Sequence, residues 1–211
     1  MARARQVAEP KRRIPRQARA TETVALILEA AAQILEAGGL VAFSTNAVAE
    51  RAGVSIGTLY QYFADKNAII MALARQEMTA ALEDVRRALQ DGTDPGVESH
   101  VRAMVRAIIH AFRGRARARK AVIQAILAQG LGVEMMVPVA AFITSAGAEV
   151  GRGPQAMLRP LSTEQLFVLS RAMMGTIRAA VLEEQSFLRS RSFEDEIVRL
   201  VIAYLSAIMK E

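Results

Sequence analysis

The residues best suited to intermolecular chemistry lie in one short stretch, AGVSIGTLYQYFADK, which covers residues 52–66. It combines hydroxyl and amide side chains with one lysine and one carboxylate, and it contains no cysteine or histidine. These groups exchange hydrogen bonds at a surface, but the stretch has no histidine or cysteine and no paired acids to form a catalytic constellation. The stretch therefore predicts a recognition surface rather than an active site.

The rest of the chain supplies no catalytic groups either. Cysteine is absent from all 211 residues, which excludes disulfides and thiolate sites and fits a reducing, cytoplasmic location. His100 and His110 have no cysteine or acidic neighbours at metal-ligand spacing. No glycine-rich phosphate loop is evident. We therefore expect no enzymatic activity, no metal and no cofactor.

The net charge of +6 is concentrated at the N-terminus. Residues 1–20 carry seven arginines and lysines against one acid, Glu9, and the other 191 residues balance. Pro10 and Pro15 interrupt this segment, so we expect a disordered basic arm over residues 1–20 that suits a polyanion. A solubilising leader is the alternative. We expect neither a signal peptide nor a membrane-spanning segment, because no long uncharged apolar run is present.

Apolar residues recur at steps of three and four along most of the chain, which predicts an all-α fold. Potential N-cap residues and glycine stops divide the pattern into about nine helices. We expect them near residues 23–38, 44–53, 55–62, 66–90, 97–113, 115–129, 133–150, 163–185 and 193–210. Capping boxes are expected at Ser162–Gln165 and, less well matched, at Ser192–Asp195.

The two short helices joined through AGVS form a helix-turn-helix signature. Gly53 can adopt the positive φ that the turn requires, and Ala49 and Ala52 allow close approach of the helices. Val54 and Leu59 have the spacing to pack this pair on the first helix. The pattern predicts a DNA-binding domain over residues 21–70.

The motifs ILEAAAQILEAGG and STNAVAERAGVSIGTLYQYFADKNAII resemble the N-terminal domain of the TetR family of bacterial transcriptional regulators. The resemblance covers residues 23–75, about a quarter of the chain. Ala64 and Asn67 depart from the family pattern, whereas Asp65 keeps its capping role.

The resemblance implies a DNA-binding site on the second short helix and its surroundings. That helix would enter the major groove, with its first residues nearest the base edges. The implied contacts are Thr45, Asn46, Ser55, Ile56, Gly57, Thr58, Tyr60, Gln61, Tyr62 and Lys66. Within residues 21–70 two basic residues face five acidic ones, so we expect the arm to supply attraction for DNA through Arg12, Arg13, Arg16 and Arg19.

The resemblance also implies that residues 71–211 form an effector-binding and homodimerisation domain. Candidate residues for a pocket that takes a small apolar or amphipathic effector are Met104, Phe112, Met135, Phe142, Phe167, Met173 and Met174. Core packing is the alternative for each of them.

Two apolar stripes on the last two helices are expected to form the dimer interface. One stripe contains Leu166, Met173, Ile177 and Val181, and the other contains Ile197, Leu200, Val201, Tyr204, Leu205 and Ile208. Packing of these stripes within one chain is the alternative.

The segment FRGRARARK, residues 112–120, carries five cations. We expect a solvated helix face near the DNA-binding half, with an anion contact as the alternative.

The expected function is that of a ligand-released repressor that binds a palindromic operator as a dimer. A transcriptional activator, a nucleoid-type DNA binder and a helical protein-interaction module remain alternatives. The sequence does not determine the effector or the operator.

Overall fold

The computed structural model describes residues 16–90, 96–112, 114–132 and 161–209. These ranges contain eight α-helices, two short 3₁₀ helices and no strand. The helix expected near residues 133–150 lies outside them. The elements are α1 (Arg16–Gly38), η1 (Gly39–Val41), α2 (Thr45–Ala52), α3 (Ile56–Tyr62), α4 (Lys66–Gln90), α5 (Val97–Ala111), α6 (Ala116–Ala128), α8 (Thr163–Leu182), η3 (Ser186–Arg189) and α9 (Arg191–Ile208).

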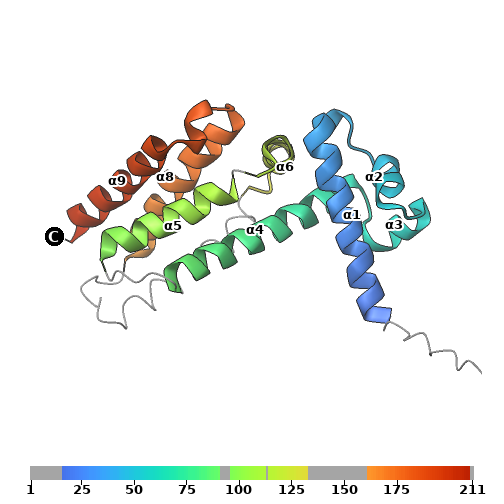
Figure 1. Ribbon diagram of the computed structural model, residues 1–211, viewed down its shortest axis with the longest axis horizontal. Coiled ribbons are helices and arrows are strands. Elements are labelled where there is room, and N and C mark those ends of the chain that lie inside the picture. The colour runs from blue at the N-terminus through green and yellow to red at the C-terminus, as the bar shows by residue number, and fades with distance from the viewer. Residues whose placement is uncertain (1–15, 91–95, 113, 133–160, 210–211) are drawn as a thin grey trace, which may run out of the picture.

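The described helices form two groups joined by α4 (Figure 1). α1, α2 and α3 gather at one end, and α5, α8 and α9 pack at the other, where the C-terminus lies. α4 belongs to both groups, because it packs against α1 at its start and against α5 further along. The single helix α4 therefore connects the two groups.

α1 begins earlier than expected. The helix starts at Arg16 rather than near Thr23, so it includes the last five residues of the predicted arm. The apolar periodicity begins only at Val24, whereas Ala18 and Ala20 favour helix without contributing apolar contacts. Arg12 and Arg13 lie outside the described residues.

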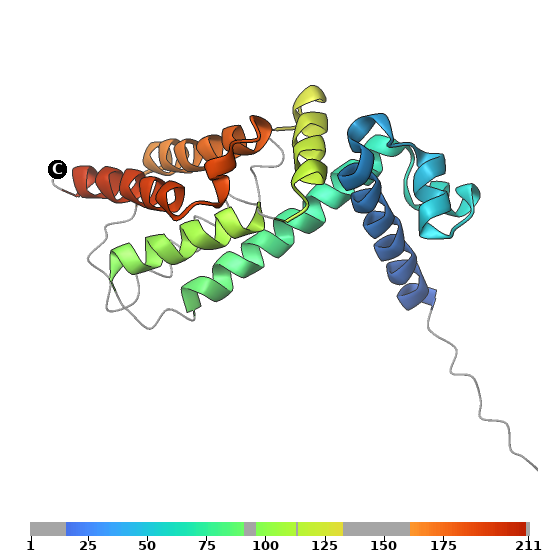
Figure 2. The same ribbon diagram turned by 45° about the horizontal axis from the view of Figure 1, so that its top comes forward.

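Two hydrophobic cores hold the chain together, and their boundary differs from the predicted domain boundary at residue 70. The first core joins α1, α2, α3 and the start of α4 to α6, through residues such as Ile27, Leu35 and Ala118. The second joins α5, α8, η3 and α9, around Val105, Ile177 and Val201. α6 is thus a neighbour of α1 in space, crossing between the two groups (Figure 2). By its position in the sequence α6 falls within the predicted domain of residues 71–211. Its buried residues nevertheless pack in the first core.

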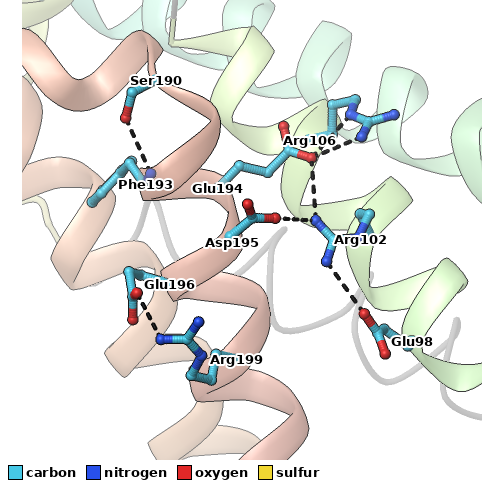
Figure 3. Close-up of polar contacts among 9 residues, drawn as sticks. All are labelled: Glu98, Arg102, Arg106, Ser190, Phe193, Glu194, Asp195, Glu196 and Arg199. Atoms are coloured by element: carbon cyan, nitrogen blue, oxygen red, sulfur yellow. Dashed lines mark hydrogen bonds and ion pairs between the residues drawn. The ribbon is translucent and has the colours of Figure 1, made fainter.

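Ion pairs attach α9 to α5 (Figure 3). The carboxylate of Glu194 is almost fully buried, and its Oε1 atom accepts hydrogen bonds from Nε and Nη2 of Arg106 at 3.1 and 2.9 Å. Arg102 bridges Glu98 on its own helix and Asp195 on α9. A buried carboxylate is stable only with such partners, so this network fixes how α9 lies on α5.

α1 and α8 have the length and apolar composition of membrane-spanning helices. In this structure one face of each helix contributes to a core, α1 through Ile27 and Leu35 and α8 through Met173 and Ile177. The apolar windows of the two helices are 39% and 28% buried in this structure.

Candidate nucleic-acid interface

The helix-turn-helix forms from local signals in the sequence. Ser44 and Ser55 cap α2 and α3, accepting hydrogen bonds from the amides of Ala47 at 3.2 Å and Thr58 at 3.0 Å. Gly53 ends α2 with φ of 68°, in the left-handed region that favours glycine. Leu59 is fully buried and holds α3 against the first core. The turn between α2 and α3 therefore has the conformation predicted from the sequence, with Gly53 at positive φ.

One hydrogen bond joins the two helices on the outer surface. The hydroxyl oxygens of Thr45, at the start of α2, and Tyr60, on α3, lie 3.2 Å apart. Tyr60 is nevertheless 52% exposed. The ring of Tyr60 is therefore held in position while most of its surface remains available to a partner.

The predicted contact residues lie on the exposed side of this unit. Asn46, Ser55, Ile56, Gly57, Tyr60, Gln61, Tyr62 and Lys66 are exposed, and Thr45 and Thr58 are partly buried. The Thr58 hydroxyl lies 2.8 Å from that of Ser55, so these two side chains orient each other at the N-terminus of α3. The structure thus brings all ten residues to accessible positions around α2, α3 and the start of α4.

Gly57 has no packing reason to be glycine. A Cβ atom built there would meet only the Ser55 hydroxyl, at 3.8 Å. Glycine inside a helix costs about 1 kcal/mol relative to alanine, so the residue weakens α3 without relieving any contact in this chain. Because Gly57 has no side chain, the surface of α3 is open at this position. This opening favours close approach of another molecule.

Lys66 begins α4, where the amide groups of the first turn attract anions. Asp65 caps this helix, with its Oδ1 atom accepting from the amide of Ala68 at 2.8 Å. Lys66 is exposed and forms no ion pair with the residues that the structure describes. Its ammonium group is therefore available for a phosphate.

Two of the acidic residues of α1 contact the segment around α6. Glu29 pairs with Arg115, just before α6, and Glu36 accepts a hydrogen bond from the amide of Ala118, on α6, at 2.9 Å. These two carboxylates are thus engaged at the interior contact of α1. The net charge of −3 over residues 21–70 therefore overstates the negative charge that faces a DNA ligand.

Residues 27–73 match the sequence profile of the bacterial regulatory proteins, tetR family. These residues form a helix-turn-helix domain of the TetR family. The chain is 43% identical over 68 residues to the HTH-type transcriptional repressor KstR of Mycolicibacterium smegmatis, covering 32% of this chain and 33% of that protein. The chain thus spans about a third of the length of the curated relatives it matches.

Two solved structures extend the likeness to the whole TetR fold. A TetR-family transcriptional regulator from Streptomyces coelicolor superimposes with a TM-score of 0.65 at 23% identity, over 88% of this chain and 98% of that one. FadR from Bacillus subtilis, in complex with stearoyl-CoA, gives 0.62 at 15% identity, over 85% and 98%. At these identities the likeness shows a shared fold.

A cavity of about 170 Å³ lies between α4, α5, α6 and α8. Four of the predicted pocket residues line it: Met104, Phe112, Met173 and Met174. Phe167 does not, because its side chain is 59% exposed on α8 with Arg171 over its ring. Met135 and Phe142 lie outside the described residues.

The cavity also has residues that the sequence reasoning missed. Glu77, Arg119 and Arg178 are the charged residues among its described lining. Glu77 lies at helical spacing with the apolar Ala74, Ala81 and other lining residues of α4, and Arg119 does so with those of α6. A charged residue within an apolar helical stripe was the signal that could have identified them.

The cationic segment of residues 112–120 is not the solvated face that was expected. Arg115 pairs with Glu29, Arg117 donates to the carbonyl oxygen of Ala37 at 2.8 Å, and Lys120 pairs with Glu184. Arg119 lies 3.7 Å from Glu77. Arg113 lies outside the described residues. The four described cations thus join α6 to its neighbours within the chain.

Most residues of the two predicted dimer stripes are buried within the chain. Met173, Ile177, Val181, Ile197, Val201, Leu205 and Ile208 belong to the second core. The prediction was wrong for these seven, because α8 and α9 bury those residues in the second core of the same chain. The large apolar side chains left exposed on the two helices, as far as the structure describes them, are Phe167, Val168 and Leu200.

Proposed function

We propose that this protein is a transcriptional repressor that binds a palindromic operator as a homodimer in the cytoplasm and is released by a small effector. The observation that carries the proposal is the open face of α3. Ile56 and Gly57 are exposed in its first turn and Tyr60 is exposed one turn later, and no packing reason for Gly57 exists. In a helix-turn-helix protein this part of the second helix faces the base edges of the major groove.

The residues have distinct roles in the proposed complex. Ile56 contacts thymine methyl groups, and the paired hydroxyls of Ser55 and Thr58 serve base edges or phosphates. Asn46 and Gln61 donate and accept hydrogen bonds beside them. Lys66 neutralises a phosphate at the start of α4. Such contacts give register and sequence preference to an interface that has little positive charge of its own.

A dimer places two such helices on one side of the operator. Half-sites about one helical turn apart, roughly 34–36 Å or somewhat more, follow from the usual geometry of these dimers. Phe167, Val168 and Leu200 are exposed on α8 and α9, and they support this pair of helices as the interface.

The cavity supports the part of the proposal in which a small effector controls DNA binding. Its walls include α6 residues, and α6 also packs in the first core against α1. A ligand that favours one position of α6 therefore favours one position of the DNA-binding half. It weakens operator binding by the ratio of its affinities for the two states. FadR, which shares the fold, holds stearoyl-CoA, so the fold accommodates an amphipathic ligand in at least one protein.

The proposal is tested by measuring binding to DNA that flanks the gene of this protein. Footprinting should reveal one protected palindrome, and Gln61→Ala and Lys66→Ala should weaken binding to it. Thr79→Ala, on the exposed part of α4 outside the helix-turn-helix, is the control. Broad protection without a palindrome would instead indicate a nucleoid-type binder, and activated transcription from the bound site an activator.

The dimer has its own test. Leu200→Arg should convert the protein to a monomer in light scattering and weaken operator binding at the same time. Val41→Arg introduces the same charge at a fully exposed residue outside α8 and α9, and it should leave the dimer intact. A dimer that survives Leu200→Arg and the same change at Phe167 would exclude this interface.

A further inference from the structure

The cavity has one polar centre in otherwise apolar walls. Glu77 on α4 and Arg119 on α6 are partly buried, with 26% and 20% of their side chains exposed. Arg178, on α8, is an exposed residue that also borders the cavity. Met78, Leu82 and the other described wall residues of α4 and α6 are apolar. A ligand that fills the cavity therefore meets the pair formed by Glu77 and Arg119 within mostly apolar walls.

Arg119 has a hydrogen-bond donor that the described part of the chain does not satisfy. Its Nε atom is buried without an acceptor. The closest carboxylate oxygen, Oε2 of Glu77, lies 3.7 Å away, which is longer than a hydrogen bond. The guanidinium group is held over the ring of Phe112, 5.9 Å from its centre. An unmet buried donor is costly in free energy, so an acceptor that reaches Nε would bind favourably.

Glu77 is a weak counterion for this arginine. Burial raises the pKa of its carboxyl group, while the positive charges of Arg119 and Arg115 act in the opposite direction. The anionic form of Glu77 is thus disfavoured by the surroundings of the cavity itself. With two arginines and one glutamate at the described walls, the balance of charge in the cavity is positive.

We propose that the cavity selects an amphipathic anion, with an acidic head that accepts a hydrogen bond from Arg119 and an apolar tail that lies against α4 and α5. This specificity rests on the proposed function, in which the cavity is the effector site. Arg119 is well placed for a regulatory contact, because its neighbours Arg117 and Ala118 hold α6 to α1. An anion bound at Arg119 thus acts one residue away from the contact between the two halves.

Three ligands that share the same alkyl tail and differ in head group test whether the cavity prefers an anion. Decanoate, decan-1-ol and decylamine are titrated calorimetrically into the full-length protein without DNA, below their micelle concentrations. Decanoate should bind tightest. Arg119→Gln should lower its affinity at least about tenfold, because a charge-assisted hydrogen bond is removed, and should leave decan-1-ol nearly unchanged. Glu77→Gln should raise decanoate affinity, because a competing carboxylate is removed.

The matched control is Arg171→Gln. Arg171 also lies over a phenylalanine ring, 4.8 Å from the centre of Phe167, but it is not among the described residues of the cavity wall. This variant should retain the preference for decanoate. Circular dichroism checks the fold of each variant, because a loss of affinity in Arg119→Gln could also follow from unfolding. The gain in decanoate affinity expected of Glu77→Gln is an independent readout, because unfolding would not produce it.

Three outcomes would overturn the inference. They are tightest binding of decylamine that disappears in Glu77→Gln, equal binding of all three compounds, and binding of none. Operator binding is measured separately on ligand-free protein. Intact operator binding with no preference for decanoate would reject only the specificity for anions. Absent operator binding would reject the proposed function, while the ranking of head groups would still be decided by calorimetry.

Discussion

The carboxylate of Glu29 on α1 accepts two hydrogen bonds from the guanidinium group of Arg115, just before α6, over 2.6 and 3.0 Å. These residues are far apart in sequence, and they join the DNA-binding half to the helix that lines the cavity. The two hydrogen bonds join the same two groups, which gives the pair a defined geometry that a single hydrogen bond would lack.

We predict a measurable coupling between Glu29 and Arg115. A double-mutant cycle with Glu29→Gln and Arg115→Ala should give an interaction free energy of about 0.5–1 kcal/mol, because both side chains are about half exposed. Chemical denaturation of the four proteins measures it. The same cycle with Glu196 and Arg199, an exposed pair within α9, is the control and should give less.

This coupling should depend on pH in a defined direction. The hydrogen bonds from Arg115 lower the pKa of Glu29 below its ordinary value of 4.5. The stabilisation that the Glu29–Arg115 pair gives the folded state is therefore fully present above pH 4.5. It disappears as the pH falls through the lower pKa that Glu29 has in the folded state. A coupling that is constant from neutral to strongly acidic pH would show that the pair contributes nothing as an ion pair.

We predict that Gly57→Ala separates stability from binding. Alanine should raise the free energy of unfolding by about 0.5–1 kcal/mol, because α3 gains helix propensity. The added Cβ meets nothing closer than the Ser55 hydroxyl, at 3.8 Å, beyond its own helix backbone and chain neighbours. Operator affinity should fall, because the added methyl group fills the open space on α3. Thermal denaturation and fluorescence anisotropy measure the two effects.

Thr79→Ala is the control for Gly57, since it also raises helix propensity but lies on α4. It should stabilise the protein without changing operator affinity. Unchanged operator binding by Gly57→Ala would place the DNA away from the N-terminal half of α3.

We predict that the basic arm supplies much of the salt-dependent attraction for DNA. Replacing Arg3, Arg5, Lys11, Arg12 and Arg13 by glutamine leaves α1 intact, because that helix begins at Arg16. The slope of log affinity against log salt should become less steep by about 0.9 for each phosphate that the arm no longer neutralises. Equal slopes for the two proteins would exclude the arm from the interface.

We predict that Arg106→Ala destabilises the fold more than an exposed arginine substitution. It leaves the buried carboxylate of Glu194 with Arg102 Nη1 at 3.9 Å as its remaining ion-pair partner among the described residues. The free energy of unfolding should fall by about 3 kcal/mol. Arg199→Ala, at an exposed ion pair, should cost less than about 0.5 kcal/mol. If Arg106→Ala and Arg199→Ala lower the free energy of unfolding equally in urea denaturation, the carboxylate of Glu194 does not depend on Arg106.

Local features of this fold were predictable because they depend on residues within one turn of each other. Ser44 and Ser55 cap their helices, Gly53 adopts positive φ, and Ser162 forms the expected capping box with Gln165. The second box was predicted two residues late, because Ser190 rather than Ser192 caps α9. Both serines precede an acidic residue at short spacing, so the sequence offered two similar starts.

The sequence by itself thus determined the all-α class, the helix-turn-helix and the exposed character of its recognition face. Only the tertiary structure decided which apolar stripe meets which helix. It placed α6 in the first core, buried most of the expected dimer stripes of α8 and α9 in the second core, and brought Glu77 to Arg119. Helix propensity and capping act over a few residues, whereas the partner of an apolar face is chosen by packing among helices distant in sequence.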